Sequence, residues 1–256
     1  MRQAIRAGAG FIVCVTVAVA AAMSATGAQR RAGTASTVTK VMPAVVRVYG
    51  RRSAGFRGVG AGVILAADGV IVTHTSNVTG VDEPIVMLDD GRRFKATVVG
   101  TDSETELAVL RIRAKGLPTL RIADSGKVRP GQWVLAIGNP FGMAREAEDD
   151  LSANLGVITA YSRVRAGGFK YRGYVFLTDA QINPGSYGGA LVDLNGLLVA
   201  LNGRIVMSED TNTEMGVAIP VNDVLPAVVR ILKRERQATT RPSRPSTRPA
   251  TTQPAV

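Results

Sequence analysis

The stretch from Thr178 to Leu191 reads TDAQINPGSYGGAL, and the interpretation of the whole chain depends on it. It follows an apolar run typical of a strand (residues 175–177), and a second strand is predicted from about Ala190. Three glycines within the stretch let the backbone turn sharply and approach other atoms closely. Such a loop is in general a structural turn, but it can also aim backbone N–H groups at one point, as an oxyanion hole does.

Short apolar runs separated by close turns fill the first half of the chain. The dipeptides Asp68-Gly69 and Asp90-Gly91 are strong hairpin signals, because the glycine accepts the backbone conformation that a tight turn needs. Six short strands are predicted between about residues 44 and 113. This pattern favours a small antiparallel barrel or sandwich.

The second half repeats the pattern and ends in a helix. The composition of residues 114–131 predicts a linker, and a second set of strands is predicted between about residues 131 and 220. A helix is then predicted over about residues 222–234, because apolar residues recur with helical spacing. These residues are Val221, Val224, Leu225, Val228, Val229 and Leu232. The predicted fold class is therefore all-β, with two strand-rich halves and a C-terminal helix.

The two ends of the chain have compositions of their own. Residues 1–28 predict a signal peptide or an uncleaved signal anchor, and the many alanines of the apolar run favour cleavage. The single cysteine, Cys14, lies in this run, so no disulfide is predicted for the exported part. Residues 29–37 predict a flexible lead-in. Residues 237–256 are rich in Pro, Thr, Ser and Arg and predict a disordered tail.

The formal net charge of +11 favours acidic partners such as anionic lipid, polysaccharide or nucleic acid, although a solvated basic surface is the simpler interpretation. Arg241, Arg244 and Arg248 of the tail lack interleaved aromatic residues, which disfavours nucleic acid. A tether to anionic envelope polymer or lipid through this tail stays open as an alternative. No cofactor or metal site is predicted. The acidic run EAEDD (residues 146–150) predicts a solvated loop, with cation binding as a weak alternative.

The segment DAQINPGSYGGAL (residues 179–191) resembles the nucleophile loop of the HtrA (Do-like) branch of trypsin-like serine proteases. Three more segments resemble this family in the same order, at residues 58–73, 91–112 and 131–142, so the resemblance covers roughly residues 38–232. It implies a trypsin-like domain over residues 38–236 with two perpendicular six-stranded β-barrels and an active site between them. It also implies a possible homotrimer. Family members usually carry PDZ domains after this domain, where this chain has its basic tail.

The resemblance implies three catalytic positions, and none of them carries the family's residue. Ser76 stands at the histidine position, Glu106 at the aspartate position and Tyr187 at the serine position. A glutamate is a mild change, since other hydrolase folds use it in this role. A serine hydroxyl cannot act as a general base near neutral pH, and a phenol has a pKa near 10. Gly185 and the N–H of Tyr187 stand at the implied oxyanion-hole positions.

Two neighbouring residues are candidates for a relocated triad. His74 is the only histidine of the chain, and Ser186 is the hydroxyl next to Tyr187 in the loop. In an extended segment, an offset of two residues displaces an imidazole by roughly 6–7 Å, which argues against such a rebuilt site.

We therefore predict an exported, catalytically inactive HtrA-like protein that binds extended polypeptide, or a partner protein of the cell envelope. The alternatives are an active serine endopeptidase of envelope quality control that uses His74 and Ser186, and an envelope-tethered interaction protein that acts through its tail.

Overall fold

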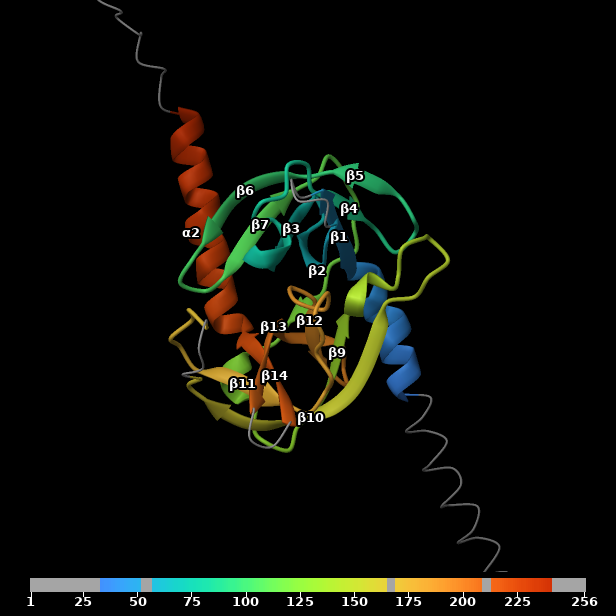
Figure 1. The fold of residues 1–256 in the computed structure, drawn as a ribbon, viewed down its shortest axis with the longest axis vertical. Coiled ribbons are helices and arrows are strands. Elements are labelled where there is room, and N and C mark those ends of the chain that lie inside the picture. Colours follow the sequence, from blue (N-terminus) through green and yellow to red (C-terminus); the bar gives the residue numbers. More distant parts are fainter. Residues whose placement is uncertain (1–32, 52–56, 165–168, 209–212, 241–256) are drawn as a thin grey trace, which may run out of the picture.

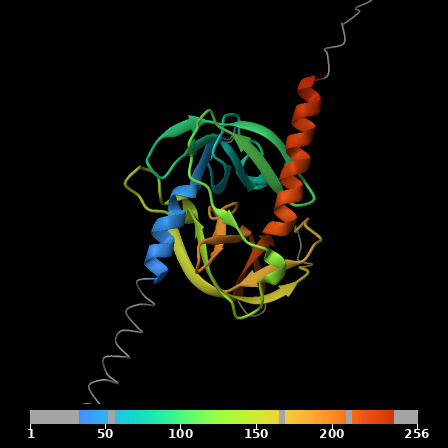
Figure 2. The ribbon, with the colours of Figure 1, turned by 180° about the vertical axis from the view of Figure 1, so that it is seen from behind.

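The computed structural model describes residues 33–51, 57–164, 169–208 and 213–240. The predicted signal segment (residues 1–28), Cys14 within it, and residues 241–256 of the predicted tail lie outside these ranges. The described chain forms two β-sheets, with helix α2 along one side and the N-terminal helical segment on the other (Figures 1 and 2). No helix in the described ranges combines the length and apolar character needed to cross a bilayer.

The first sheet contains seven strands in the order β5-β4-β1-β2-β3-β7-β6. Its hairpin β2–β3 turns at the predicted Asp68-Gly69, where Gly69 has φ +100° and a side chain would lie 2.2 Å from the Ile112 carbonyl oxygen. The strands are β1 (Val45–Arg51), β2 (Arg57–Ala66), β3 (Val70–His74), β4 (Ile85–Met87), β5 (Arg93–Lys95), β6 (Thr97–Asp102) and β7 (Leu107–Arg111).

The second sheet has the order β12-β9-β10-β11-β14-β13-β8, and the additional pairing of β12 with β13 closes six of its strands into a barrel. The strands are β8 (Arg121–Ile122), β9 (Trp133–Gly138), β10 (Ser152–Ser162), β11 (Val175–Thr178), β12 (Ala190–Asp193), β13 (Leu197–Ser208) and β14 (Thr213–Pro220). Strand β8 pairs with β13 in parallel. The predicted mostly-β fold with two strand-rich halves and a C-terminal helix is confirmed. The second half is a closed six-stranded barrel, whereas the first half is a half-barrel with seven strands instead of the predicted six.

The start of the described chain differs from the predicted flexible lead-in, because residues 33–41 are helical. The Thr37 hydroxyl donates a hydrogen bond of 2.8 Å to the Leu194 carbonyl oxygen, and Val41 is buried. The sequence of this stretch shows no helical pattern, because the contacts that hold the helix are made with residues far away in the chain. Four short 3-10 helices complete the described elements: η1 (Met42–Ala44), η2 (Thr75–Asn77), η3 (Ser125–Lys127) and η4 (Pro140–Gly142).

Helix α2 spans Val221–Thr240, so it is longer than the predicted 222–234 and enters the segment predicted to be disordered. In the first turn of the helix, the Asn222 side chain accepts a hydrogen bond from the backbone N–H of Ser125 in η3 and donates one to the carboxylate of Asp124 beside it. Helix α2 contacts β6 and β7 of the first sheet and β13 and β14 of the second. Val229, predicted on the apolar face, is 48% exposed, whereas Ile231 is buried. Helix α2 thus joins the two sheets.

Candidate functional site

The loop after β11 is docked from the second sheet onto the first. Gly188 has φ +83°, and a side chain there would lie 2.6 Å from the Ala61 carbonyl oxygen, the His74 backbone nitrogen and the Thr73 hydroxyl. The neighbouring Tyr187 carbonyl oxygen accepts hydrogen bonds from the Ala61 N–H at 3.2 Å and the Asn77 side-chain amide at 2.8 Å. These contacts place the loop at the junction of the two sheets, as the glycine pattern allows.

The three positions that the resemblance implies meet at this junction. Ser76 lies in η2, Glu106 lies just before β7, and Tyr187 lies in the docked loop. The Thr75 N–H donates a 2.8 Å hydrogen bond to the Glu106 carbonyl oxygen, which holds η2 beside Glu106. Glu106 itself has φ +55°, a left-handed conformation that costs a non-glycine residue free energy. The substituted positions are therefore side by side, on a backbone that is held in place.

His74 is bound to Ser76 rather than to a catalytic partner. The Nδ1 atom of His74 lies 2.7 Å from the Ser76 hydroxyl and accepts the Ser76 backbone N–H at 3.1 Å. Because a backbone N–H can only donate, Nδ1 is unprotonated, and in the neutral ring the proton is on Nε2. His74 thus caps η2. The extended geometry assumed from the sequence does not apply here, since the 3-10 turn brings positions 74 and 76 into direct contact.

The surroundings of His74 disfavour its protonated form. Burial first, and the positive charge of Arg204 second, lower the pKa of His74 to about 4. In a serine protease triad a carboxylate binds the imidazole and stabilises its protonated form. Within the described part of the chain, no hydrogen bond or ion pair joins Glu106 to His74. The Glu106 Oε1 atom instead lies 3.8 Å from an Arg204 nitrogen, while Oε2 is buried and has no hydrogen-bond partner among the described residues.

Tyr187 faces His74 across the junction, with the two ring centroids 5.8 Å apart. The ring packs against the buried cluster of the second sheet, which includes Ile182. Burial raises the pKa of Tyr187, although a hydrogen bond with the Ile205 backbone and the charge of Arg204 lower it in part. The phenol is therefore protonated near neutral pH and is a poor nucleophile.

Ser186 of the docked loop packs against β9. It is buried, and a side chain at Gly138 of β9 would lie 2.6 Å from its Cα and Cβ atoms and 2.9 Å from its hydroxyl oxygen. No hydrogen bond between Ser186 and His74 occurs among the described residues. The structure therefore does not bring the two candidates for a relocated triad together.

Gly185 precedes these residues and supports the shape of the loop. It has φ +96°, and a side chain there would lie 2.2 Å from the Asn139 carbonyl oxygen. In the part of the chain that the structure describes, the N–H groups of Gly185 and Tyr187 donate no hydrogen bond to another backbone group. The assignment of these two groups as an oxyanion hole stays a prediction.

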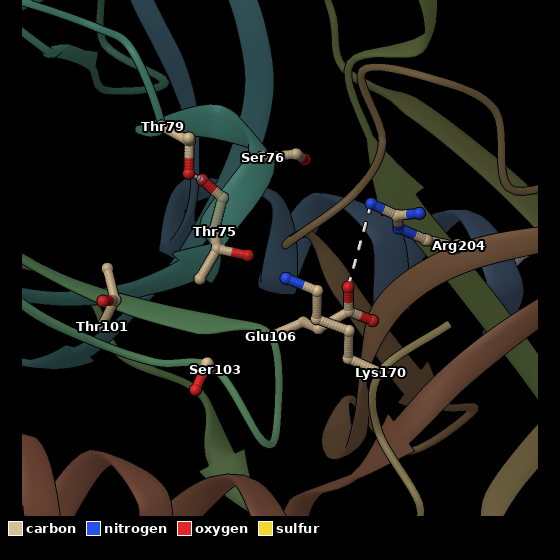
Figure 3. Close-up of a pocket in the computed structure, with 8 residues that line it drawn as sticks. All are labelled: Thr75, Ser76, Thr79, Thr101, Ser103, Glu106, Lys170 and Arg204. Carbon is tan, nitrogen blue, oxygen red and sulfur yellow. Dashed lines mark hydrogen bonds and ion pairs between the residues drawn. The ribbon is translucent and has the colours of Figure 1, made fainter. Parts of the chain in front are cut away.

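A cavity of about 450 Å³ opens beside the substituted positions, between the two sheets (Figure 3). Two basic residues of the second sheet's side line it, Lys170 before β11 and Arg204 in β13. Sequence reasoning missed both, because each belongs to no motif. The one signal was a charge at position 204 in the mostly apolar strand β13. The cavity is lined by Thr75, Ser76, Thr79, Thr101, Ser103, Glu106, Lys170 and Arg204.

The acidic run at residues 146–150 makes contacts within the protein. The Asp149 carboxylate accepts hydrogen bonds from the N–H groups of Arg145 at 2.7 Å and Glu146 at 2.9 Å. Glu146 forms an exposed ion pair of 2.8 Å with Arg93. These partners occupy carboxylate oxygens that the weak alternative of cation binding would need. Groups of three or more metal-ligating side chains are absent from the described ranges.

Comparison with known proteins identifies relatives of this domain. The family profile described as "Trypsin-like peptidase domain" matches residues 60–201. A protein of Halomonas elongata named "Probable periplasmic serine endoprotease DegP-like" is 40% identical over 166 residues, which are 65% of this chain and 33% of that protein. A Haemophilus influenzae protein named "Probable periplasmic serine protease do/HhoA-like" is 37% identical over 186 residues, 72% of this chain and 39% of that protein. The chain thus spans about a third of the length of these curated relatives.

Solved structures give the same result for the fold. The structure described as "HtrA-type protease AlgW with tripeptide" has a TM-score of 0.71 and 37% identity, covering 78% of this chain and 64% of that one. The structure described as "HtrA-type protease AlgW with decapeptide" has a TM-score of 0.70 and 33% identity, covering 79% and 68%.

Proposed function

Because the chain belongs to the trypsin-like peptidase family and is similar to its HtrA-type members, we propose that it is a non-catalytic member that binds extended polypeptide at the junction of its two barrels. The relatives are named proteases, so the proposal rests on the residues of this site and not on the family. All three implied triad positions are substituted, by Ser76, Glu106 and Tyr187.

The observation that carries the proposal is the state of His74, the chain's only histidine. Its Nδ1 atom is occupied by Ser76, it is buried, and its pKa is lowered to about 4. A general base works best when its pKa is near the working pH, and this imidazole resists the protonation that proton transfer from a nucleophile requires. Because this imidazole is a weakened base, neither a serine nor a tyrosine here becomes an efficient nucleophile.

Binding of polypeptide is supported by the retained framework. The docked loop still closes on the first barrel, and the HtrA-type neighbours are described with a tripeptide and a decapeptide bound. An extended peptide can pair with a strand edge without any catalytic residue. Because the relatives are named periplasmic, we place this activity in the cell envelope.

The test is degradation of unfolded casein by the exported chain, beside its His74→Ala and Ser186→Ala variants. We expect no cleavage by any of the three proteins and no labelling by a fluorophosphonate probe. Casein should still bind, as measured by fluorescence anisotropy. Cleavage that is lost in both variants would show a relocated triad and contradict the proposal.

A restored variant supplies the positive control. It combines Ser76→His, Glu106→Asp and Tyr187→Ser, so that each implied position carries the family's residue. Fluorophosphonate labelling at position 187 in this variant, and its absence in the natural chain, would show that the framework is intact and that the three substitutions remove the activity. A well-folded restored variant that resists labelling would show that the framework itself has changed.

A further inference from the structure

The cavity beside Ser76 has two chemically different sides (Figure 3). The side formed by the first barrel carries hydroxyl groups and the carboxylate of Glu106. Two of these hydroxyls have partners that fix their orientation: the Ser76 hydroxyl binds His74 Nδ1, and the Thr79 hydroxyl donates to the Thr75 carbonyl oxygen. The side formed by the second barrel carries the two cations described above. The described residues that line it include no aromatic or large aliphatic side chain, so the cavity suits a polar group.

The charges of the cavity do not cancel. Glu106 and Arg204 lie 3.8 Å apart, at the long end of the range for an ion pair, and the Glu106 side chain is only 5% exposed. Lys170 is exposed, and Figure 3 shows its amino group directed into the cavity. Within the described ranges, no carboxylate lies within 4.0 Å of the Lys170 nitrogen. Among the described residues that line the cavity, Lys170 and Arg204 carry positive charges and Glu106 carries the one negative charge, and this balance favours an anion.

We propose that this cavity selects polypeptides by a carboxylate, held between the Lys170 ammonium and the Arg204 guanidinium. This inference rests on the proposed polypeptide binding and names its specificity. A planar guanidinium matches the geometry of a carboxylate, and an adjacent ammonium adds a second charge-assisted hydrogen bond. An acidic side chain and a C-terminal carboxylate share this chemistry, and three peptides distinguish them.

The peptides are fluorescein-labelled decapeptides of Ala, Ser and Gly with one variable central residue. The first has a central Glu and an amidated C-terminus, the second has Gln in its place, and the third has Gln and a free C-terminal carboxylate. We expect the full exported chain to bind the first at least about tenfold more tightly than the second, by fluorescence anisotropy. Tight binding of the third peptide alone would assign the site to a chain terminus rather than an acidic side chain.

Variants locate the preference in the cavity. Lys170→Gln should reduce the ratio of Glu to Gln peptide affinity to about two or less, and Arg204→Gln should act in the same direction. Lys115→Gln is the matched control, since Lys115 is an exposed lysine outside the cavity. Glu106→Gln should raise the affinity for the Glu peptide, because it removes a carboxylate that competes for Arg204. Lys170 is exposed, so its variant keeps the test valid even where a change at position 204 disturbs folding.

The outcomes separate this inference from the proposed function. Equal binding of all three peptides, or a charge preference that Lys170→Gln leaves unchanged, would overturn the inference while polypeptide binding stands. Binding that weakens in Glu106→Gln would also overturn it, since the cavity would then recognise a hydrogen-bond donor. Absence of binding by every peptide and by casein would overturn both proposals.

Discussion

His74 is the only histidine of the chain, so its imidazole gives one unambiguous set of NMR signals. Burial and Arg204 together lower its pKa to about 4. We predict that Arg204→Gln raises the pKa of His74 but leaves it below 6.5, because burial is the larger cause and persists. The measurement is an NMR titration of the ring protons, with Lys115→Gln as the control that keeps the midpoint. An unchanged midpoint in Arg204→Gln would show that the two side chains do not interact.

The same lowered pKa makes stability depend on pH. The pKa of His74 is lower in the folded chain than the usual 6.5 of the unfolded chain, so the unfolded chain binds more protons between about pH 4 and 6.5. The free energy of unfolding therefore rises with pH across this window, by about 3 kcal/mol from this residue. The free energy of unfolding, measured with urea at several pH values, should rise less steeply with pH in His74→Gln than in the natural chain. Equal slopes would mean that His74 titrates normally.

At the residue scale, the sequence predicted the three implied catalytic positions but not the side chains that contact them. The resemblance identified Ser76, Glu106 and Tyr187 by alignment of motifs. The contact between His74 and Ser76 was not predictable, because a 3-10 turn replaces the extended segment that the strand pattern suggested. Arg204 reaches Glu106 only because β13 of one barrel faces the turn before β7 of the other, and such a contact leaves no local pattern.

Among the elements, the docked loop provides a direct test of the junction. We predict that Gly188→Ala lowers the free energy of unfolding by about 3 kcal/mol, because its side chain would strike β2 and β3 as well as adopt a positive φ. Gly116→Ala is the matched control: Gly116 has φ +66° with no atom within 4 Å of an added side chain. Its cost should be about 1 kcal/mol, from backbone strain alone. Equal losses in urea unfolding would mean that the loop is not docked.

The turn between β6 and β7 depends on one carboxylate. Asp102 accepts the N–H groups of Glu104 at 3.0 Å and Thr105 at 3.3 Å, and it pairs with Arg230 of α2 at 2.6 Å. We predict that Asp102→Ala lowers the free energy of unfolding by about 2 kcal/mol, since two backbone donors lose their acceptor. Arg230→Met should cost less, about 1 kcal/mol, because it leaves those two bonds in place.

The pH dependence provides a check on this turn. Burial raises the pKa of Asp102, but the hydrogen bond from Arg230 and the N–H groups of Thr105 and Glu104 outweigh it, so the pKa is lowered overall. Its contribution to stability is therefore present above the usual aspartate pKa and is lost as the pH falls through the lowered value. The difference between Asp102→Ala and the natural chain should shrink in acid. A difference that is constant with pH would contradict this account.

The elements themselves were largely predictable because their signals are local. The hairpin glycines Gly69 and Gly91 both have positive φ, as the turn dipeptides required. The helical segment at residues 33–41 and the full length of α2 were not predicted. Both are stabilised by contacts with distant residues, such as Thr37 with Leu194, which outweigh weak local propensity.

For the molecule as a whole, helix α2 joins the two sheets, as the docked loop does at the site. Ile231 is 2% exposed, and a side chain at Gly100 of β6 would lie 3.0 Å from its Cγ2 atom. We predict that Ile231→Ala lowers the free energy of unfolding by about 3 kcal/mol and that unfolding stays a single transition. Val229→Ala on the same helix, at a site 48% exposed, should change it by less than about 0.5 kcal/mol. Two separate transitions in Ile231→Ala would mean that the barrels unfold independently.

This bridging helix has a consequence for how occupancy can be detected. Because α2 contacts strands of both sheets, we expect the two sheets to unfold together. A ligand in the cavity, which residues of both sheets line, is released in that transition. Mass action then adds its binding free energy to the whole transition, about 2.7 kcal/mol when the ligand is at one hundred times its dissociation constant. The melting temperature of the unlabelled chain thus acts as a direct gauge of ligand at the junction, whatever the ligand's own optical properties.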